Sequence, residues 1–107
     1  MELRKNTVYL VESPTDTTVL LAAGAVYNKE TGYVEWWDTV RGRMKKVERI
    51  LCNTEDEFKF TNGENIYIFT KLTLENFKKK VRDKVVFGEN LEFSSDVELQ
   101  EFYLNNF

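Results

Sequence analysis

The residues best suited to bind a ligand lie between positions 33 and 49. An aromatic group is followed there by a basic run that contains a single acid, Glu48. Tryptophan and tyrosine rings can stack on bases while Lys and Arg hold phosphates, and aromatic residues and Arg are equally typical of protein–protein anchors. We predict that one binding surface, called below the aromatic–basic set, is formed by Tyr33, Trp36, Trp37, Arg41, Arg43, Lys45, Lys46 and Arg49.

The same residues have a purely structural interpretation. Val34 and Trp36 alternate along a strand and belong to the core, Trp37 packs on a neighbouring element, and the basic side chains keep a strand face in water. Tryptophan and tyrosine are more often packed inside than displayed as stacking platforms. The sequence leaves open which of the two tryptophans is exposed.

Three other groups of side chains carry atoms that can react or bind metals. The acidic triplet Glu55–Glu57 lacks the spaced oxygen ligands that Ca²⁺ needs, so we expect a solvated loop. Cys52 has no histidine beside it to activate the thiol, so we expect a half-buried strand residue. Asp16 and Asp38 can act as a carboxylate pair only if the fold brings them together, which nothing in the sequence indicates. We expect no metal site.

Several common chemistries are missing from the sequence. It has no histidine, one cysteine and no glycine-rich phosphate-binding loop. These absences exclude a Ser-His-Asp triad, a Cys-His pair and the usual zinc ligands. Carboxylates, lysine or tyrosine can still support catalysis, so enzymes as a class are disfavoured rather than excluded. We expect a protein that is not an enzyme and that uses no cofactor.

Length and composition favour one folded domain over residues 1–107. Of the 107 residues, 42% are hydrophobic and 31% charged, which is typical of globular domains. The lone cysteine suits a reducing compartment, and the first residues lack the apolar run of a signal peptide. The longest apolar stretch, Val19–Tyr27, is too short to cross a bilayer. We therefore expect a cytoplasmic protein with no membrane contact.

The first two-thirds of the chain has strand patterns. Apolar residues 8–11 and 17–27 predict two strands, and residues 28–32 predict a hairpin loop leading to a third strand over 33–40. Residues 43–51 predict a fourth strand, with a helix over 38–51 as the alternative that Gly42 disfavours.

Asn62-Gly63 is the strongest turn signal in the chain. A two-residue loop at this pair places Phe60 opposite Asn65 and Phe58 opposite Tyr67. Four aromatic rings then share one face, which we expect to be core: Phe58, Phe60, Tyr67 and Phe69.

Two helices are predicted after the strands. Thr73 is a good N-cap for a helix over about 73–84, with Leu72 and Phe77 placed as a hydrophobic staple. A capping box from Ser95 to Glu98 begins a second helix over about 95–105. The predicted fold is therefore α+β: an antiparallel β-sheet or small open β-barrel of about six strands (residues 7–70), followed by two C-terminal helices.

Charge is distributed unevenly along the chain. Residues 41–49 and 71–84 are rich in Lys and Arg, whereas residues 85–107 contain acids but neither Lys nor Arg. Lys, Asn, Phe and Tyr, which have AT-rich codons, are abundant, and this favours an origin in a low-GC bacterium or its phage.

These observations together favour a non-catalytic binding protein. We expect a phage- or mobile-element-encoded inhibitor that occludes a host protein stoichiometrically, such as a defence protein. The alternative is a binder or sponge of single-stranded nucleic acid, or of a nucleotide-derived signal molecule, through the aromatic–basic set. Two copies can also pair if the first strand is an exposed edge.

Overall fold

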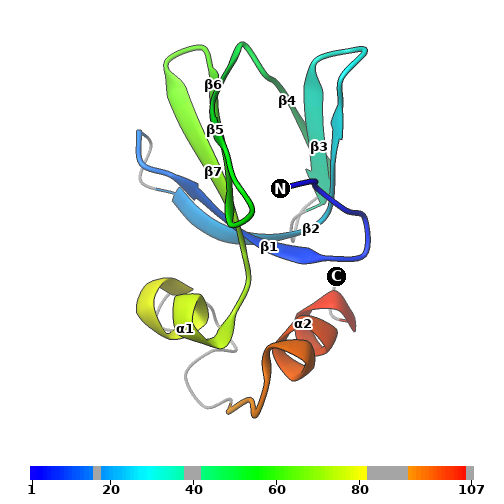
Figure 1. The fold of residues 1–107 in the computed structure, drawn as a ribbon, viewed down its shortest axis with the longest axis vertical. Coiled ribbons are helices and arrows are strands. Elements are labelled where there is room, and N and C mark those ends of the chain that lie inside the picture. The colour runs from blue at the N-terminus through cyan, green and yellow to red at the C-terminus, as the bar shows by residue number, and fades with distance from the viewer. Residues whose placement is uncertain (16–17, 38–41, 82–91, 106–107) are drawn as a thin grey trace.

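Seven strands form one antiparallel sheet in the order β4-β3-β2-β1-β7-β6-β5, and two helical segments follow it (Figure 1). This computed structural model describes residues 1–15, 18–37, 42–81 and 92–105, without the side chains of 18–20, 37, 42, 43 and 81. The strands are β1 (Val8–Ser13), β2 (Thr18–Asn28), β3 (Tyr33–Trp37), β4 (Gly42–Lys46), β5 (Arg49–Asn53), β6 (Glu57–Asn62) and β7 (Asn65–Lys71). The predicted α+β fold is confirmed, with one more strand than expected.

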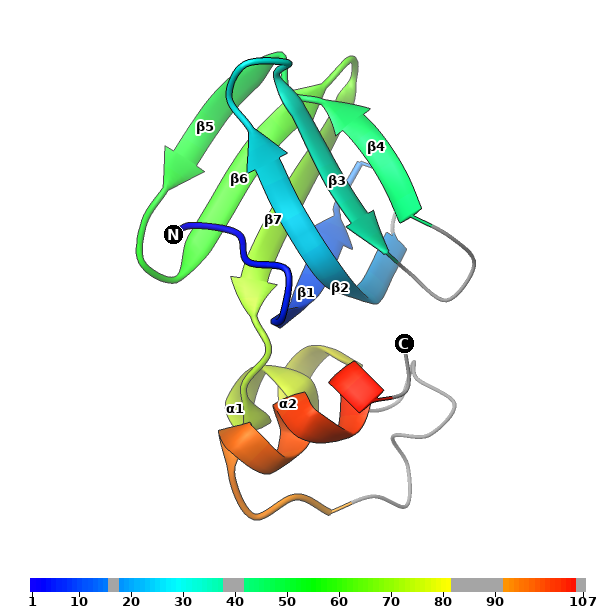
Figure 2. The same cartoon turned by 90° about the vertical axis from the view of Figure 1, so that its right-hand side faces the viewer.

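The additional strand arises because the single strand predicted over 43–51 is wrong. This segment forms β4 and β5, which lie at opposite edges of the sheet (Figure 2). Between them, the Val47 N–H donates to the Gly32 carbonyl at 2.7 Å and the Glu48 N–H to the Thr61 carbonyl at 2.9 Å. These bonds turn the chain from one hairpin to another. The alternative helix over 38–51 is also wrong from residue 42 onward, and residues 38–41 lie outside the described ranges.

The first strand is not an edge, so the predicted route to a dimer is wrong. β1 is the central strand and pairs with β2 on one side and β7 on the other. β2 pairs with β1 through residues 18–23 and with β3 mainly through residues 26–28, and Gly24, with a φ of 73°, lies where the pairing with β3 shifts between Ala23 and Val26. Such irregularities increase local twist and allow a sheet to curl.

The hairpin between β2 and β3 forms as predicted. The Asn28 carboxamide oxygen accepts hydrogen bonds from the Glu30 and Thr31 N–H groups at 2.9 and 3.3 Å. Gly32 has a φ of 77° and its N–H donates to the Asn28 carbonyl at 2.8 Å. Glycine suits this position because positive φ costs it no steric penalty.

The β6–β7 hairpin has a different register from the predicted one. Asn62 pairs with Asn65, so the loop is Gly63-Glu64, and Phe60 therefore faces Tyr67. Asn62 remains in the strand, where its side-chain amide donates to the Lys46 carbonyl at 2.7 Å. The register differs by two residues, which leaves every side chain on its predicted face because strands have a period of two. The four predicted aromatic rings are accordingly all buried.

Two hydrophobic cores lie on the two faces of β1. Alternate residues of β1 point to opposite faces: Tyr9 and Val11 to one, Val8 and Leu10 to the other. The first core lies inside the curled sheet and also contains Leu3, Ala22, Ala25, Val34, Trp36, Phe58, Phe60, Tyr67 and Phe69. The second lies between the sheet and the helices and also contains Leu21, Ala23, Leu72, Phe77, Leu99 and Tyr103.

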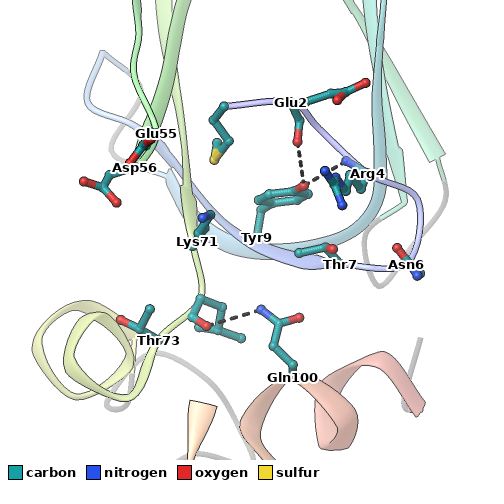
Figure 3. Close-up of a pocket in the computed structure, with 12 residues that line it drawn as sticks. Glu2, Arg4, Asn6, Thr7, Tyr9, Glu55, Asp56, Lys71, Thr73 and Gln100 are labelled. Atoms are coloured by element: carbon teal, nitrogen blue, oxygen red, sulfur yellow. Dashed lines mark hydrogen bonds between the residues drawn. The ribbon is translucent and has the colours of Figure 1, made fainter. Parts of the chain in front are cut away.

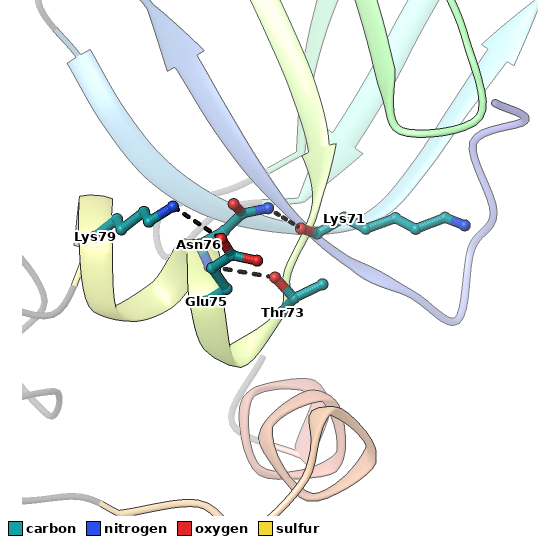
Figure 4. A network of polar contacts seen from close by, with 5 residues as sticks. All are labelled: Lys71, Thr73, Glu75, Asn76 and Lys79. Atoms are coloured by element: carbon teal, nitrogen blue, oxygen red, sulfur yellow. Dashed lines mark hydrogen bonds and ion pairs between the residues drawn. The ribbon is translucent and has the colours of Figure 1, made fainter.

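The first helical segment begins at the predicted cap. Helix α1 (Leu74–Asn76) continues as the π-helical turn η1 (Phe77–Val81). The Thr73 hydroxyl accepts from the Asn76 N–H at 3.2 Å, and the Asn76 side chain donates to the Lys71 carbonyl at the same distance (Figure 4). Residues 82–84 of the predicted helix lie outside the described ranges.

The second helix, α2 (Asp96–Asn105), agrees with the prediction for 95–105. The Ser95 hydroxyl accepts from the Glu98 N–H at 3.1 Å, while the Glu98 carboxylate binds the hydroxyl and N–H of Ser94. The two hydrogen bonds from Ser94 lower the pKa of Glu98. Asp96 accepts from the Leu74 N–H at 2.8 Å and so joins the starts of the two helical segments.

Candidate binding surface

The fold divides the aromatic–basic set between the interior and the surface. Tyr33 is paired with Lys46 and Trp36 with Arg43 across β3 and β4. Arg41 lies outside the described residues, as do the side chains of Trp37 and Arg43. The structure therefore places the side chains of only five members of the aromatic–basic set: Tyr33, Trp36, Lys45, Lys46 and Arg49.

Trp36 lies in the first core with only 2% of its surface exposed. Its ring centroid is 5.4 Å from that of Phe69 in an edge-to-face contact and 6.3 Å from that of Tyr67. Val34 is buried in the same core. The structural interpretation is thus confirmed for these two residues, and Trp36 is not available to stack on a ligand.

Lys45 is held at the margin of this core. Its ammonium lies 5.5 Å from the centroid of the Tyr67 ring, within the range of a cation–π contact. Lys45 is half-buried, whereas Lys46 and Arg49 are exposed. The basic residues therefore differ in role, because Lys45 is positioned by an aromatic ring and its two neighbours project into solvent.

Most of the exposed large apolar side chains lie near these basic residues. In the described part of the chain they are Tyr33, Met44, Ile50, Leu51 and, on α2, Val97. Four of these five belong to β3, β4 or β5. We define the corner surface as Tyr33, Met44, Lys46, Arg49, Ile50 and Leu51.

Hydrogen bonds and strand pairing bring Tyr33, Lys46 and Arg49 of the corner surface to the same end of the sheet. Lys46 lies opposite Tyr33, and its carbonyl accepts from Asn62. Arg49 lies opposite Thr61, the residue before Asn62. The connection between β4 and β5 therefore carries Lys46 and Arg49 across the end of the β6–β7 hairpin. This end of the sheet lies away from the helices (Figure 1).

The charge of this surface is not neutralised by direct contacts among the described residues. The ion pairs described there join Glu75 to Lys79 at 2.8 Å and Glu12 to Lys80 at 3.2 Å, both remote from β4 and β5 in sequence. Neither Lys46 nor Arg49 has a described carboxylate partner. The corner surface thus combines exposed apolar side chains with available positive charge.

A hollow of about 770 Å³ lies elsewhere, beside the N-terminal segment (Figure 3). Its charged lining is mixed, with acids and cations from different segments: Glu2, Arg4, Glu55, Asp56 and Lys71. The sequence did not indicate this hollow, because its walls come from segments far apart in the chain.

Two polar side chains of the lining, Tyr9 and Gln100, already have protein partners. The Tyr9 hydroxyl accepts from the Arg4 N–H at 2.8 Å and donates to the Glu2 carbonyl at 3.4 Å. The Gln100 side chain is bonded to backbone groups of Val8 and Leu72, and Figure 3 draws the bond to Leu72. These bonds hold the N-terminal segment and α2 against the sheet, and they favour a structural role for the hollow.

The remaining candidate residues form no reactive cluster in the described ranges. No group of three or more metal-ligating side chains occurs among the residues that the structure describes. Glu55 and Asp56 are exposed, Cys52 is half-buried opposite Lys59, and Asp16 and Asp38 lie outside the description. Within the same ranges, the helices are too short or too polar to cross a bilayer.

Searches of family models, curated proteins and solved structures return no match to the chain.

Proposed function

We propose that the protein is a non-catalytic binding protein whose corner surface contacts another protein. The observation that carries this proposal is the concentration of exposed apolar side chains on β3, β4 and β5, the strands that also carry the exposed Lys46 and Arg49. Tyrosine and arginine, here Tyr33 and Arg49, are enriched at binding hot spots, and burial of the neighbouring apolar area adds affinity. Met44, with 64% of its surface exposed, is the principal anchor.

The charge of the corner surface supports an acidic partner. Lys46 and Arg49 make no described ion pair, although Glu35 and Glu48 are exposed nearby, so both cations are available to carboxylates of an acidic partner. Complementary charge accelerates association and excludes partners of the same sign.

The proposed biological role is stoichiometric inhibition. We propose that a phage or mobile element encodes the protein, which acts in the host cytoplasm by occluding a host protein, such as a defence protein. The support for this origin is the abundance of residues with AT-rich codons, while the lack of histidine and of a phosphate-binding loop supports a role without catalysis.

Affinity capture from lysates of low-GC bacteria tests the proposal with matched variants. The test variant combines Met44→Asp with Arg49→Glu. The control combines Val97→Asp with Lys78→Glu, because Val97 is 65% exposed and Lys78 is also a surface cation. We expect the unmodified protein and the control to retain one partner near 1:1, and the test variant to retain at least tenfold less. Equal capture by both variants, or capture of no partner at all, contradicts the proposal.

The alternative ligand is single-stranded nucleic acid or a nucleotide, and the exposed Tyr33 ring opposite Lys46 favours it. Titration with oligonucleotides and cyclic nucleotides, followed by intrinsic fluorescence, distinguishes this function. Binding that weakens steeply with salt and is lost in Tyr33→Ala supports the alternative. Our leading proposal predicts no such response.

A further inference from the structure

The two edges of the sheet differ in regularity. β4 pairs with β3 over five consecutive residues without a shift, whereas the pairing of β5 with β6 is irregular between Ile50 and Cys52. A bulge twists an edge strand and discourages the addition of another strand. β4 is therefore the edge better suited to receive a further strand.

Hydrogen bonds indicate which backbone groups of β4 point outward. The Lys46 carbonyl accepts from Asn62, which is not on β3, while the Val47 N–H donates to Gly32, which directly precedes β3. Backbone direction alternates along a strand of an antiparallel pair. The N–H and carbonyl of Met44 therefore point away from β3, toward the open edge.

Charge disfavours the pairing of a second copy of the chain with this edge. Antiparallel self-pairing centred on Met44 places Arg43 of each copy opposite Lys45 of the other. Like charges directly opposed across strands are destabilising, and lysine on an edge strand is a common protection against self-association. The charges of this edge thus favour a strand with acidic side chains over a second copy of the chain.

We propose that the β4 edge binds an extended acidic segment of the partner protein, which adds to the sheet as an eighth strand. This inference rests on the proposed function and specifies its partner. Met44 and Lys45 lie on opposite faces of β4, because successive strand residues alternate. The segment therefore carries an apolar residue beside Met44 and a carboxylate beside Lys45, in an alternating acidic and apolar pattern.

A capped nine-residue peptide of alternating glutamate and valine is the probe, and one of alternating lysine and valine is its control. Titration into ¹⁵N-labelled protein is followed by amide chemical shifts and amide exchange. We expect saturable binding of the acidic peptide alone, with the largest shifts in residues 42–46 and slower exchange of the Met44 amide.

Variants separate backbone pairing from charge. Met44→Pro removes the outward N–H but none of the bonds to β3, and we expect it to weaken peptide binding more than tenfold, while Met44→Leu stays within threefold. Lys45→Glu should also weaken binding more than tenfold, and the remote Lys78→Glu should leave it unchanged. Amide spectra of each variant verify its fold. If the Met44→Pro variant is unfolded, the Lys45→Glu variant still tests the inference.

Three results overturn the inference: no binding of the acidic peptide, equal binding of the basic peptide, or shifts centred on β5 or the N-terminal hollow. An oligonucleotide that occupies residues 42–46 when the acidic peptide does not also overturns it. Partner capture that is lost in the Met44→Asp and Arg49→Glu variant but kept by Met44→Pro leaves the proposed function standing without strand addition. Capture that neither variant affects refutes both.

Discussion

Gln100 joins helix α2 to the sheet through three hydrogen bonds. Its side chain accepts from the Val8 N–H at 2.8 Å and donates to the carbonyls of Val8 at 2.8 Å and Leu72 at 3.2 Å. Gln100→Ala leaves these partly buried backbone groups without partners, so we expect a loss of about 1–3 kcal/mol in the free energy of unfolding. Urea denaturation measures the loss. The exposed neighbour Glu101→Ala is the control, and an equal effect of both changes contradicts this role.

Tyr103 provides a pH-dependent test of the second core. Its hydroxyl is buried without a described hydrogen-bond partner, and burial raises the pKa of the phenol. The pKa of the Tyr103 phenol is higher in the folded than in the unfolded protein. Its contribution to the free energy of unfolding is therefore complete below pH ~10 and is lost as the pH rises above that value. We expect Tyr103→Phe to be neutral or stabilising at pH 7 and to reduce the loss of stability above pH 10. Thermal melts between pH 7 and 11 check this, and an unchanged alkaline slope contradicts it.

Single residues show what the sequence could and could not predict about the site. The burial of Val34 and Trp36 follows from their alternation and from the preference of large rings for the core. The cation–π contact of Lys45 with Tyr67 depends on how β4 is placed relative to β7, which no local pattern encodes. The exposure of Met44 likewise reflects its place on an edge strand.

At the scale of elements, local turn chemistry predicted the hairpins and long-range bonds determined their details. Asn62-Gly63 correctly marked the β6–β7 turn, but the bond from Asn62 to Lys46 accompanies a register two residues from the expected one. The division of residues 43–51 into β4 and β5 has a similar origin. The bonds that make the corner reach Gly32 and Thr61, which are distant in sequence.

Gly63 tests this account of the turn. It has a φ of 59°, and a Cβ added there meets no atom within 4 Å, so the cost of substitution is in the backbone alone. We expect Gly63→Ala to lower the free energy of unfolding by ~1–2 kcal/mol, because a side chain disfavours positive φ. Glu64→Ala, the other loop residue, should change it by less than about 0.5 kcal/mol. Urea denaturation measures the free energy of unfolding of both variants. Similar losses in the two would contradict a turn that depends on the positive φ of Gly63.

At the scale of the whole molecule, β1 couples the two cores because its alternate residues belong to each. We therefore expect a single unfolding transition. Phe60→Ala in the first core should cost about 3–5 kcal/mol and Leu99→Ala in the second about 2–5 kcal/mol. Far-UV circular dichroism follows the overall secondary structure, and Trp36 fluorescence, measured in a Trp37→Phe background, follows the first core. Coincident transitions in both variants are expected, and separate melting of the helices would contradict the coupling.

Hydrogen–deuterium exchange of the protein, alone and with its captured partner, tests the central claim most directly. The corner surface and the β4 edge both fall within residues 33–51. We expect partner-dependent protection of amides in residues 42–51, strongest at Met44. Protection confined to the N-terminal hollow, residues 1–9 with 55–56 and 71–73, would contradict the claim.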